Sequence, residues 1–275
     1  MPELPEVETV RRGLHAHVVG RRIISAEQLH PRGLNPKSLS SLHVLAGAKV
    51  LDTGRRGKFL WLVLDRPYVL AAHLGMSGQF LIDPADHRHT RALFMLKKGM
   101  KSTQLHFNDQ RTFGWVSVEE SVNGLPTSVQ KIAPDPFDEL FNLSHVIADI
   151  SRRNISIKSA ILNQNIISGI GNIYADESLW LAKVHPERRA HEMKSAEITK
   201  VLDAAKQVMT SALKVGGTSF DELYINVNGE SGYFDISLNA YGQEGEPCPR
   251  CGKQITRIKF ANRSSHFCPK CQRLR

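Results

Sequence analysis

The sequence predicts a two-domain α+β protein, with an N-terminal helix and a β-sandwich or barrel before a helical half and a C-terminal zinc-binding β-hairpin. Three observations predict this fold class: short apolar segments over residues 22–118, helical periodicity after residue 134, and four cysteines within the last 28 of 275 residues. Short alternating segments separated by Gly, Pro and Asp are typical of sandwiches and barrels. Apolar residues at every third or fourth position are typical of amphipathic helices.

The N-terminal helix is expected to start at Pro5 and to end at Gly20. Proline is favoured in a first helical turn, and Glu6 and Glu8 suit the positive end of the helix dipole. Strands are then expected at residues 23–26, 48–52, 59–64, 69–73, 79–82, 93–96, 103–107 and 115–118.

The Pro-rich segment 133–136 ends the strand pattern and marks the expected domain boundary. Helices are predicted at residues 144–154, 156–164, 172–181 and 195–215, and the last of these is strongly amphipathic. The resulting division is a domain at 1–133, a linker at 134–137, a helical module at 138–217, a loop region at 218–239 and a finger at 240–275. No apolar run approaches the ~20 residues that a membrane span requires, so we expect a soluble intracellular protein.

The cysteines predict a metal site, because they are spaced as Cys248-x2-Cys251-x16-Cys268-x2-Cys271. Two such pairs can place four thiolates tetrahedrally around one Zn²⁺. The segment between the pairs is long enough for a hairpin with strands at 254–260 and 265–267 and a turn at 262–264. Two disulfides are the alternative, which the absence of a secretory signal and of any other cysteine disfavours.

Positive charge is concentrated on this finger. Residues 247–275 contain eight Lys or Arg and no Asp or Glu, whereas the first 246 residues are almost balanced, with 28 basic and 27 acidic side chains. A concentrated basic patch favours a polyanionic partner, most often nucleic acid. A tail that is merely solvated is the alternative.

The N-terminus offers a candidate nucleophile. Removal of Met1 would expose the secondary amine of Pro2, and an α-amine titrates near pH ~8, so that a fraction is neutral at physiological pH. Attack of this amine on a sugar C1′ gives an iminium, and Glu3 could shuttle the protons that the reaction requires. The alternative is that Pro2 and Glu3 only begin a helix.

Three loops could contact a nucleic acid. Two glycines precede Asn172 at the start of an expected helix, where free backbone N–H groups suit a phosphate, although Gly also simply interrupts helices. The segments 73–78 and 109–114 each combine a basic residue with a large apolar one. Such side chains can insert between bases, and packing in the core is the alternative.

Together these segments resemble the formamidopyrimidine-DNA glycosylases, bacterial enzymes that excise oxidised purines. The resemblance covers the whole chain in order: Met-Pro-Glu-Leu-Pro-Glu-Val-Glu-Thr at 1–9, Arg-Arg-Gly-Lys at 55–58, His-Leu-Gly-Met-Ser-Gly at 73–78, the loop 109–114, Gly-Ile-Gly-Asn-Ile-Tyr-Ala-Asp-Glu at 169–177, Gly-Gly-Thr at 216–218 and the zinc hairpin. It implies a catalytic β-sandwich domain, a helix–two-turn–helix DNA-binding module, a lesion-recognition loop within 218–239 and a β-hairpin zinc finger.

The resemblance also implies four catalytic residues. Pro2 matches the Schiff-base nucleophile, and Glu3 matches the proton donor that opens the sugar. Lys58 matches a lysine that contacts phosphate and assists β-elimination. Arg263 matches an arginine that binds phosphate and assists δ-elimination.

Seven further residues match positions that contact DNA in the family: His73, Met76, His87, Arg111, Phe113, Asn154 and Asn172. Three of them form the gap-filling trio (Met76, Arg111 and Phe113), which occupies the space left by a flipped nucleotide. Two departures weaken the resemblance locally. Thr112 stands where the family's loop has a second Arg, and Asn154 stands where it often has Lys.

The implied function is that of a bifunctional DNA glycosylase and AP lyase of base excision repair. It would remove 8-oxoguanine and formamidopyrimidines from duplex DNA through a Pro2 Schiff base and cleave the strand by β,δ-elimination. One structural Zn²⁺, no nucleotide cofactor, damaged double-stranded DNA as partner and a monomer are expected, in a bacterial cytoplasm and bound to the nucleoid through DNA.

Two alternatives remain from the sequence. An endonuclease VIII-type glycosylase for oxidised pyrimidines usually begins Met-Pro-Glu-Gly-Pro, and Leu4 argues against it. A non-catalytic zinc-finger DNA-binding protein would explain the charged finger but not the Pro-Glu N-terminus.

Overall fold

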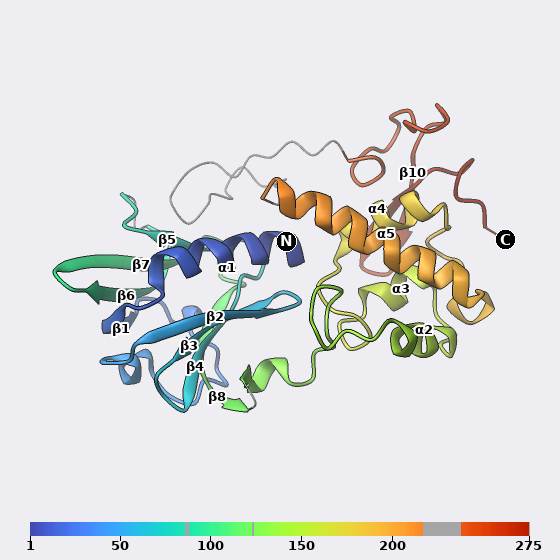
Figure 1. The fold of residues 1–275 in the computed structure, drawn as a ribbon. Helices are drawn as coiled ribbons and strands as arrows, with labels where there is room; N and C mark the ends of the chain where they lie inside the picture. Colours follow the sequence, from blue (N-terminus) through green and yellow to red (C-terminus); the bar gives the residue numbers. More distant parts are fainter. Residues whose placement is uncertain (86–87, 123, 217–237, 275) are drawn as a thin grey trace. The chain divides into compact units, whose positions relative to one another are not determined.

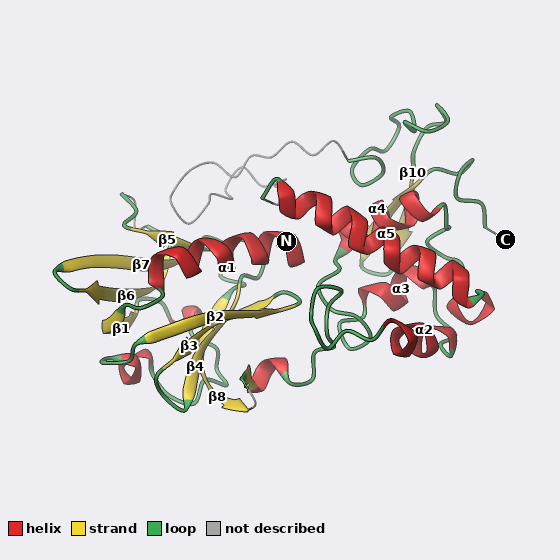
Figure 2. Ribbon diagram, viewed as in Figure 1, coloured by secondary structure: helices red, strands yellow, loops and turns green. Residues whose placement is uncertain are grey.

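The computed structural model describes residues 1–85, 88–122, 124–216 and 238–274, and these form two compact units. Unit 1 comprises Met1–Lys131, and unit 2 comprises Ile132–Lys214 together with residues 238–274. The division lies next to the Pro-rich segment 133–136. Figure 1 shows the elements of each unit, and Figure 2 separates helices from strands.

Unit 1 contains two antiparallel sheets. The first has the strand order β1-β6-β7-β5, with β1 at Arg22–Gln28, β5 at Gly78–Ile82, β6 at Thr90–Lys98 and β7 at Lys101–Asp109. The second has the order β2-β3-β4-β8-β9, with β2 at Val50–Arg56, β3 at Phe59–Leu64, β4 at Tyr68–His73, β8 at Trp115–Val122 and β9 at Leu125–Pro126. All eight expected strands are confirmed, and β9 is additional.

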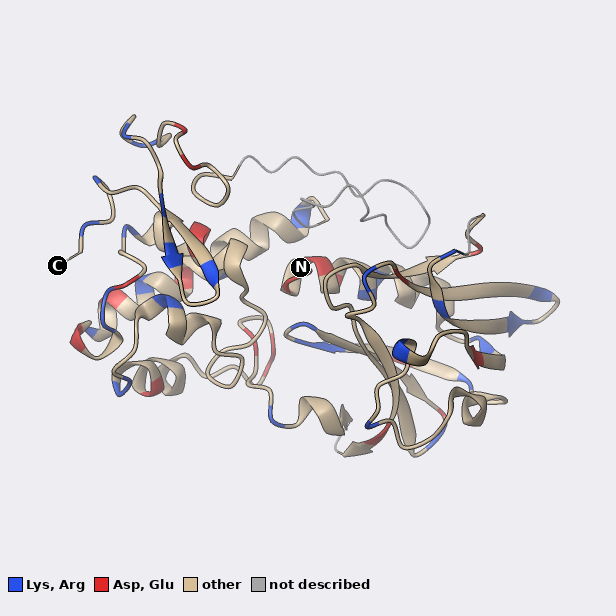
Figure 3. Cartoon of the chain, turned by 180° about the vertical axis from the view of Figure 1, so that it is seen from behind, with Lys and Arg blue, Asp and Glu red and all other residues tan. Residues whose placement is uncertain are grey.

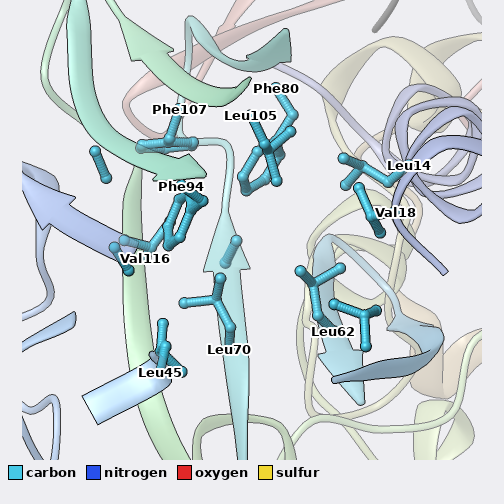
Figure 4. Close-up of a cluster of buried hydrophobic side chains, with 14 of the residues drawn as sticks. Leu14, Val18, Leu45, Leu62, Leu70, Phe80, Phe94, Leu105, Phe107 and Val116 are labelled. Atoms are coloured by element: carbon cyan, nitrogen blue, oxygen red, sulfur yellow. The ribbon is translucent and has the colours of Figure 1, made fainter. Parts of the chain in front are cut away.

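Side chains from both sheets and from the first helix form one core (Figure 4). Along β6 every second side chain is buried, including Phe94, because successive residues of a strand point to opposite faces. Helix α1, Leu4–Val18, contributes Leu14 and Val18 from the face that spacing of three and four residues produces. The N-terminal helix and the β-sandwich are thereby confirmed.

Unit 2 is built on four helices and a hairpin: α2 at Leu143–Ser151, α3 at Ile157–Leu162, α4 at Asn172–Ala182, α5 at Ser195–Lys214, β10 at Thr256–Phe260 and β11 at Arg263–Phe267. Helix α4 packs against α3, α5 and β11. All four expected helices are confirmed, but α2 and α3 are shorter than expected. Asn142 and Ser156 cap their first turns by accepting backbone N–H bonds from His145 and Ser159.

Four short 3₁₀ helices complete the described elements, at Pro31–Gly33, Leu42–Leu45, Thr127–Val129 and Ala190–Glu192. Within the ranges that the structure describes, no helix combines the length and hydropathy needed to cross a membrane.

The expected turn of the zinc hairpin was misplaced. Phe260 pairs directly with Arg263, so the turn consists of Ala261 and Asn262 rather than residues 262–264. Ala261 has a φ of 49°, and two-residue hairpin turns require such positive values. Arg263 is therefore the first residue of β11.

Candidate nucleic-acid interface and zinc site

The start of α1 holds the two N-terminal candidates in a defined place. Glu3 is the N-cap residue and is only 2% exposed, and its backbone N–H donates to Glu6 Oε2 at 2.8 Å in a capping box. Pro2 is half-buried, whereas Met1 is exposed. The helix-start interpretation is therefore correct, and it is also what would keep a Pro2 amine in one position.

Lys58 lies in the two-residue turn between β2 and β3. Arg56 pairs with Phe59 across this turn, and Gly57 adopts a φ of 55° that favours glycine. The Lys58 side chain is buried, which is rare for a lysine, and it is not without interactions. The turn therefore confines its ammonium group.

His73, at the end of β4, is close enough to Lys58 to sense its charge. Burial, and secondly the Lys58 charge, lower the pKa of His73 to about 4. Its Nδ1 accepts the Gly75 N–H at 3.1 Å, and its ring lies 4.9 Å from that of Phe59 and 6.0 Å from that of Trp115. A neutral ring that accepts at Nδ1 carries its proton on Nε2, so His73 offers one neutral donor at pH 7.

A buried carboxylate joins the two loops of the gap-filling trio. Asp109 is fully buried, and its Oδ1 accepts from the Ser77 hydroxyl at 2.5 Å and from the Arg111 N–H at 3.2 Å. Its Oδ2 accepts from the Gly114 N–H at 2.6 Å. A Cβ on Gly75 would lie 2.4 Å from the backbone of Phe113, so the loops are in close contact. Asp109 lies within the motif 109–114, but local sequence pattern does not reveal this role.

The trio itself projects from these loops. Phe113 is 59% exposed, so the alternative of a core-facing phenylalanine is wrong. Arg111 is exposed as well, with its guanidinium carbon 5.6 Å from the Phe113 ring centroid, and Met76 is half-buried. An exposed aromatic ring beside a guanidinium suits insertion next to bases.

In unit 2, Asn172 begins α4 beside the zinc hairpin. Gly171 is the N-cap, and Asn172 Nδ2 donates to the Ser264 carbonyl at 3.0 Å. The structure therefore brings Asn172 close to Arg263, which is exposed. An amide has two donor hydrogens, so Asn172 retains one for a phosphate oxygen.

A fully buried ion pair holds this hairpin on α4. Lys158 Nζ lies 2.6 Å from Asp176 Oδ1 and also donates to the Ser264 carbonyl at 3.1 Å. Asp176 further accepts from the Ser265 hydroxyl at 2.8 Å and the His266 N–H at 2.9 Å. Removing one partner of a buried pair typically costs about 3–5 kcal/mol. The sequence analysis missed this network, since nothing in the local pattern shows that Lys158 is buried.

The next residue of α4 binds the chain where it re-enters unit 2. Glu177 is 2% exposed and accepts backbone N–H bonds from Asn239, Ala240 and Tyr241 at 2.8–3.1 Å. Two adjacent carboxylates thus bind different parts of the finger. The candidate lesion loop precedes Asn239, and its residues 218–237 lie outside the described residues, as does His87.

The four cysteines fit a single zinc ion. Their sulfurs all lie within 4.8 Å of one another, and Cys251 and Cys268 are 3.5 Å apart, too far for a disulfide. The Trp180 indole N–H donates to Cys248 Sγ at 3.4 Å. Such donors orient metal-bound thiolates.

Most of the finger's described basic residues are exposed. Figure 3 marks Lys and Arg in blue, and Arg257, Lys259 and Arg263 on the hairpin are exposed. Arg250 is an exception, because its guanidinium packs 4.0 Å from the Trp180 ring centroid. Asn154 is exposed and lines a cavity of about 680 Å³ together with Lys259 and other residues of unit 2.

Three family models match the chain. The formamidopyrimidine-DNA glycosylase N-terminal domain matches residues 1–116, and the H2TH domain of the same enzymes matches residues 132–223. A zinc finger found in FPG and IleRS matches residues 245–274. The last match and the four clustered cysteines show one structural zinc ion.

Curated relatives match over the full length. The formamidopyrimidine-DNA glycosylase of Mycobacteroides abscessus is 52% identical, covering 100% of this chain and 99% of the relative. That of Corynebacterium glutamicum is 51% identical, covering 100% of both chains.

Solved structures are similar as well. The Thermus thermophilus MutM (Fpg) crystal structure superposes with a TM-score of 0.87 at 33% identity over 100% of both chains. The Lactococcus lactis Fpg complex with abasic-site DNA has a TM-score of 0.83 at 33% identity, covering 98% and 99% of the two chains. Lactococcus lactis Fpg has also been solved with DNA containing Fapy-dG, as a mutant, and with DNA containing an oxidised pyrimidine.

The substitution Asp109→Asn should loosen both gap-filling loops. An amide replaces one acceptor oxygen by a donor, so at least one buried N–H or hydroxyl loses its partner at a cost of about 1–3 kcal/mol. Urea denaturation should show this loss, and the Arg111 and Gly114 amides should exchange hydrogen faster. The exposed Asp203→Asn is the control, and unchanged exchange at Gly114 would contradict the assignment.

His73 should make stability depend on pH. Its pKa falls from an ordinary 6.5 to about 4 on folding, so the unfolded chain binds the proton more readily between these values. The free energy of unfolding therefore keeps its full value above pH 6.5 and declines as the pH falls towards 4. The decline between pH 7 and pH 4.5 should be on the order of 2 kcal/mol. Urea denaturation at several pH values measures this dependence in wild type, in His73→Gln and in the exposed-site control His43→Gln. A pH-independent difference between wild type and His73→Gln would refute it.

Zinc removal should unfold the hairpin while unit 1 remains folded. Structural zinc sites contribute folding free energy directly, with apparent binding free energies of about 10–16 kcal/mol in small finger peptides. Hydrogen exchange before and after chelation should show lost protection at β10 and β11 only, and zinc should restore it. Cys268→Ser should behave as the chelated protein does, without recovery. Persistent hairpin protection in the metal-free chain would show that the buried α4 contacts suffice.

Proposed function

The chain belongs to the formamidopyrimidine-DNA glycosylase family, and from this membership we propose which of its residues perform the reaction. The protein is a DNA glycosylase of base excision repair that acts on oxidised bases, with the AP lyase activity typical of the family. The observation that carries the residue assignment is the Pro2-Glu3 start of α1, held in one position by a capping box. The full-length match to named glycosylases excludes a non-catalytic zinc-finger protein.

In the proposed mechanism Pro2 is the nucleophile. Once Met1 has been removed, the lone pair of the secondary amine attacks C1′ of the damaged nucleotide, and the bond from C1′ to the oxidised base breaks. Glu3 supplies a proton to the sugar ring oxygen, so the sugar opens and the C1′–nitrogen bond becomes an iminium. The attacking nitrogen loses its hydrogen as a proton to solvent before the iminium forms, and the base leaves with a proton from solvent or a neighbouring acid.

Strand cleavage follows from the iminium. It acidifies the C2′ hydrogens, and loss of one of them expels the 3′ phosphate by β-elimination. A second elimination expels the 5′ phosphate and leaves a one-nucleotide gap. We assign Lys58 to phosphate binding during the first step and Arg263 to phosphate binding during the second, because Lys58 is a cation within a tight hairpin turn and Arg263 is a cation directly after one.

DNA binding requires the target nucleotide to leave the helix, at a cost of a few kcal/mol. We assign the gap-filling trio to the space that it vacates, with Arg111 facing the orphaned cytosine. Neutral His73 and the half-free amide of Asn172 are donors for phosphates near the lesion. His87 and Asn154 complete the proposed DNA contacts.

The preferred substrates are proposed to be oxidised purines, 8-oxoguanine and formamidopyrimidines. Leu4 and the exposed trio support this branch. An endonuclease VIII-type preference for oxidised pyrimidines is the alternative. Binding alone does not separate the two, because the Lactococcus lactis relative has been solved with lesions of both kinds.

We propose that the segments of the chain have the following roles. Residues 1–133 form the catalytic domain, 134–137 the linker, 138–217 the DNA-binding helical module, 218–239 the lesion-recognition region and 240–275 the finger. The protein is proposed to act as a monomer in the bacterial cytoplasm, bound to the nucleoid through DNA, without a nucleotide cofactor.

Borohydride reduction of the iminium tests the assignment of Pro2. Wild type should form a covalent adduct with a duplex containing 8-oxoguanine opposite cytosine, and Pro2→Gly should reduce its rate roughly tenfold or more, as removal of a reacting group does. Pro5→Ala is the control, since it alters the first helical turn but keeps the Pro2 amine. Adducts formed mainly on a dihydrouracil duplex would indicate the pyrimidine branch, and full trapping by Pro2→Gly would remove Pro2 from the mechanism.

A further inference from the structure

Polar contacts from Glu8, Arg11 and His15 join one side of α1 to β2, and these two elements lie next to each other in Figure 1. Glu8 contacts Arg55, Arg11 donates to the Thr53 hydroxyl at 2.9 Å, and His15 lies 3.2 Å from the same hydroxyl. Residues 8, 11 and 15 lie on one helical face, since spacings of three and four residues place side chains one above another. The contact through Glu8 is the nearest of the three to Pro2.

Glu8 is a largely buried carboxylate among three arginines. Arg11 donates to both of its oxygens at 2.8 and 2.9 Å, Arg12 donates to Oε1 at 2.8 Å, and Arg55 donates to Oε2 at 3.1 Å. Burial raises the pKa of Glu8, but the hydrogen bond and charge of Arg11, the charge of Arg55 and the Arg12 bond outweigh it and lower the pKa to about 2. Glu8 is therefore charged throughout the neutral range.

Arg55 binds two elements at once. Its side chain is 9% exposed, its Nε donates to Glu8, and its Nη1 donates to the Gly57 carbonyl at 3.1 Å. Gly57 directly precedes Lys58 in the β2–β3 turn. A continuous path of hydrogen bonds thus runs from α1 through one guanidinium to the backbone of the turn that carries Lys58.

We propose that Glu8 and Arg55 are positioning residues for the glycosylase and lyase reaction. They hold the start of α1, with Pro2 and Glu3, at a fixed position relative to the turn that carries Lys58. The inference rests on the proposed function, because it assumes that these three residues act on one nucleotide. Neither positioning residue touches the reacting atoms.

The physical reason is the precision that the reaction requires. The Pro2 nitrogen must reach C1′ while Lys58 binds a phosphate of the same nucleotide, and a misplacement of about 1 Å can cost about 10²-fold in rate. Glu8 is one helical turn from the start of α1, so little of the helix lies between the contact and Pro2. A planar guanidinium that bonds two partners permits less rotation than an ammonium on a flexible stem.

The test compares Glu8→Gln, Arg55→Gln and the double variant with Arg12→Gln. Arg12 bonds to the same carboxylate, but from the same helix and with a side chain 59% exposed, so its loss leaves the contact with β2 in place. Single-turnover base excision with saturating enzyme should slow about 10–100-fold in both single variants. The double variant should be no slower than the slower single variant, because both changes break one path. Arg12→Gln should stay within about twofold of wild type.

Two further measurements separate positioning from stability. The dissociation constant for a duplex with a reduced abasic site should change less than threefold, since no DNA contact is removed, and rates should be measured well below each variant's Tm. Arg55→Lys keeps a charge opposite Glu8 but cannot reproduce both bonds, so it should remain slow. Wild-type rates in Arg55→Lys, multiplicative losses in the double variant or losses confined to DNA affinity would each overturn the proposal.

Failure of the proposed function is distinguishable in the same experiment. Wild type that forms no borohydride adduct would refute the Pro2 mechanism and the positioning role with it. If wild type forms the borohydride adduct, and Glu8→Gln and Arg55→Gln are as active as wild type, the positioning role alone is refuted.

Discussion

A carboxylate that leaves water must be compensated by hydrogen bonds or opposite charge, because an unpaired buried ion costs several kcal/mol. This constraint organises the protein around a few acidic residues. Asp109 binds the two gap-filling loops, Asp176 binds the zinc hairpin, and Glu177 binds the chain that leads into the finger. Most partners of Asp109 and Glu177 are backbone N–H groups, so these two carboxylates determine the path of a loop, whereas Asp176 combines one backbone N–H with side-chain partners.

This arrangement explains how the loops that carry the proposed DNA contacts are held in place. Loops are the usual place for binding residues, but they lack the regular hydrogen bonds of helices and strands. Here Asp109 supplies fixed acceptors from the end of β7, and Asp176 and Glu177 supply them from α4. The exposed side chains of Phe113 and Arg263 are therefore carried by backbone that is bonded to the interior of its own unit.

Local sequence pattern was sufficient for the elements and for the metal site. Alternation gave the eight strands, helical spacing gave α1 and α5, and the cysteine spacing gave four sulfurs within reach of one ion. Local sequence pattern did not predict the structural features that depend on contacts between residues far apart in sequence. Lys158 and Asp176 are ordinary surface types on short helices until the hairpin covers them, and the hairpin turn shifted because pairing of Phe260 with Arg263 selects a two-residue loop. The side-chain exposure of Phe113 likewise depends on the Asp109 bonds.

Contacts far apart in sequence join the helical part of unit 2 to its last segment, and this separation has a consequence for biosynthesis. Lys158 meets the Ser264 carbonyl, Glu177 meets Ala240, and the Gln272 amide donates to the Val184 carbonyl at 2.9 Å. A ribosome that has completed α4 must still translate as far as Ala240 for the Glu177 contact, and as far as Ser264 and Gln272 for the other two. Until then two acidic side chains of α4 stay hydrated and the helix lacks its cover, since non-local contacts must await closure of the intervening chain. Unit 2 thus matures after its last residues leave the ribosome, whereas residues 1–131 contain their own core and can fold during translation.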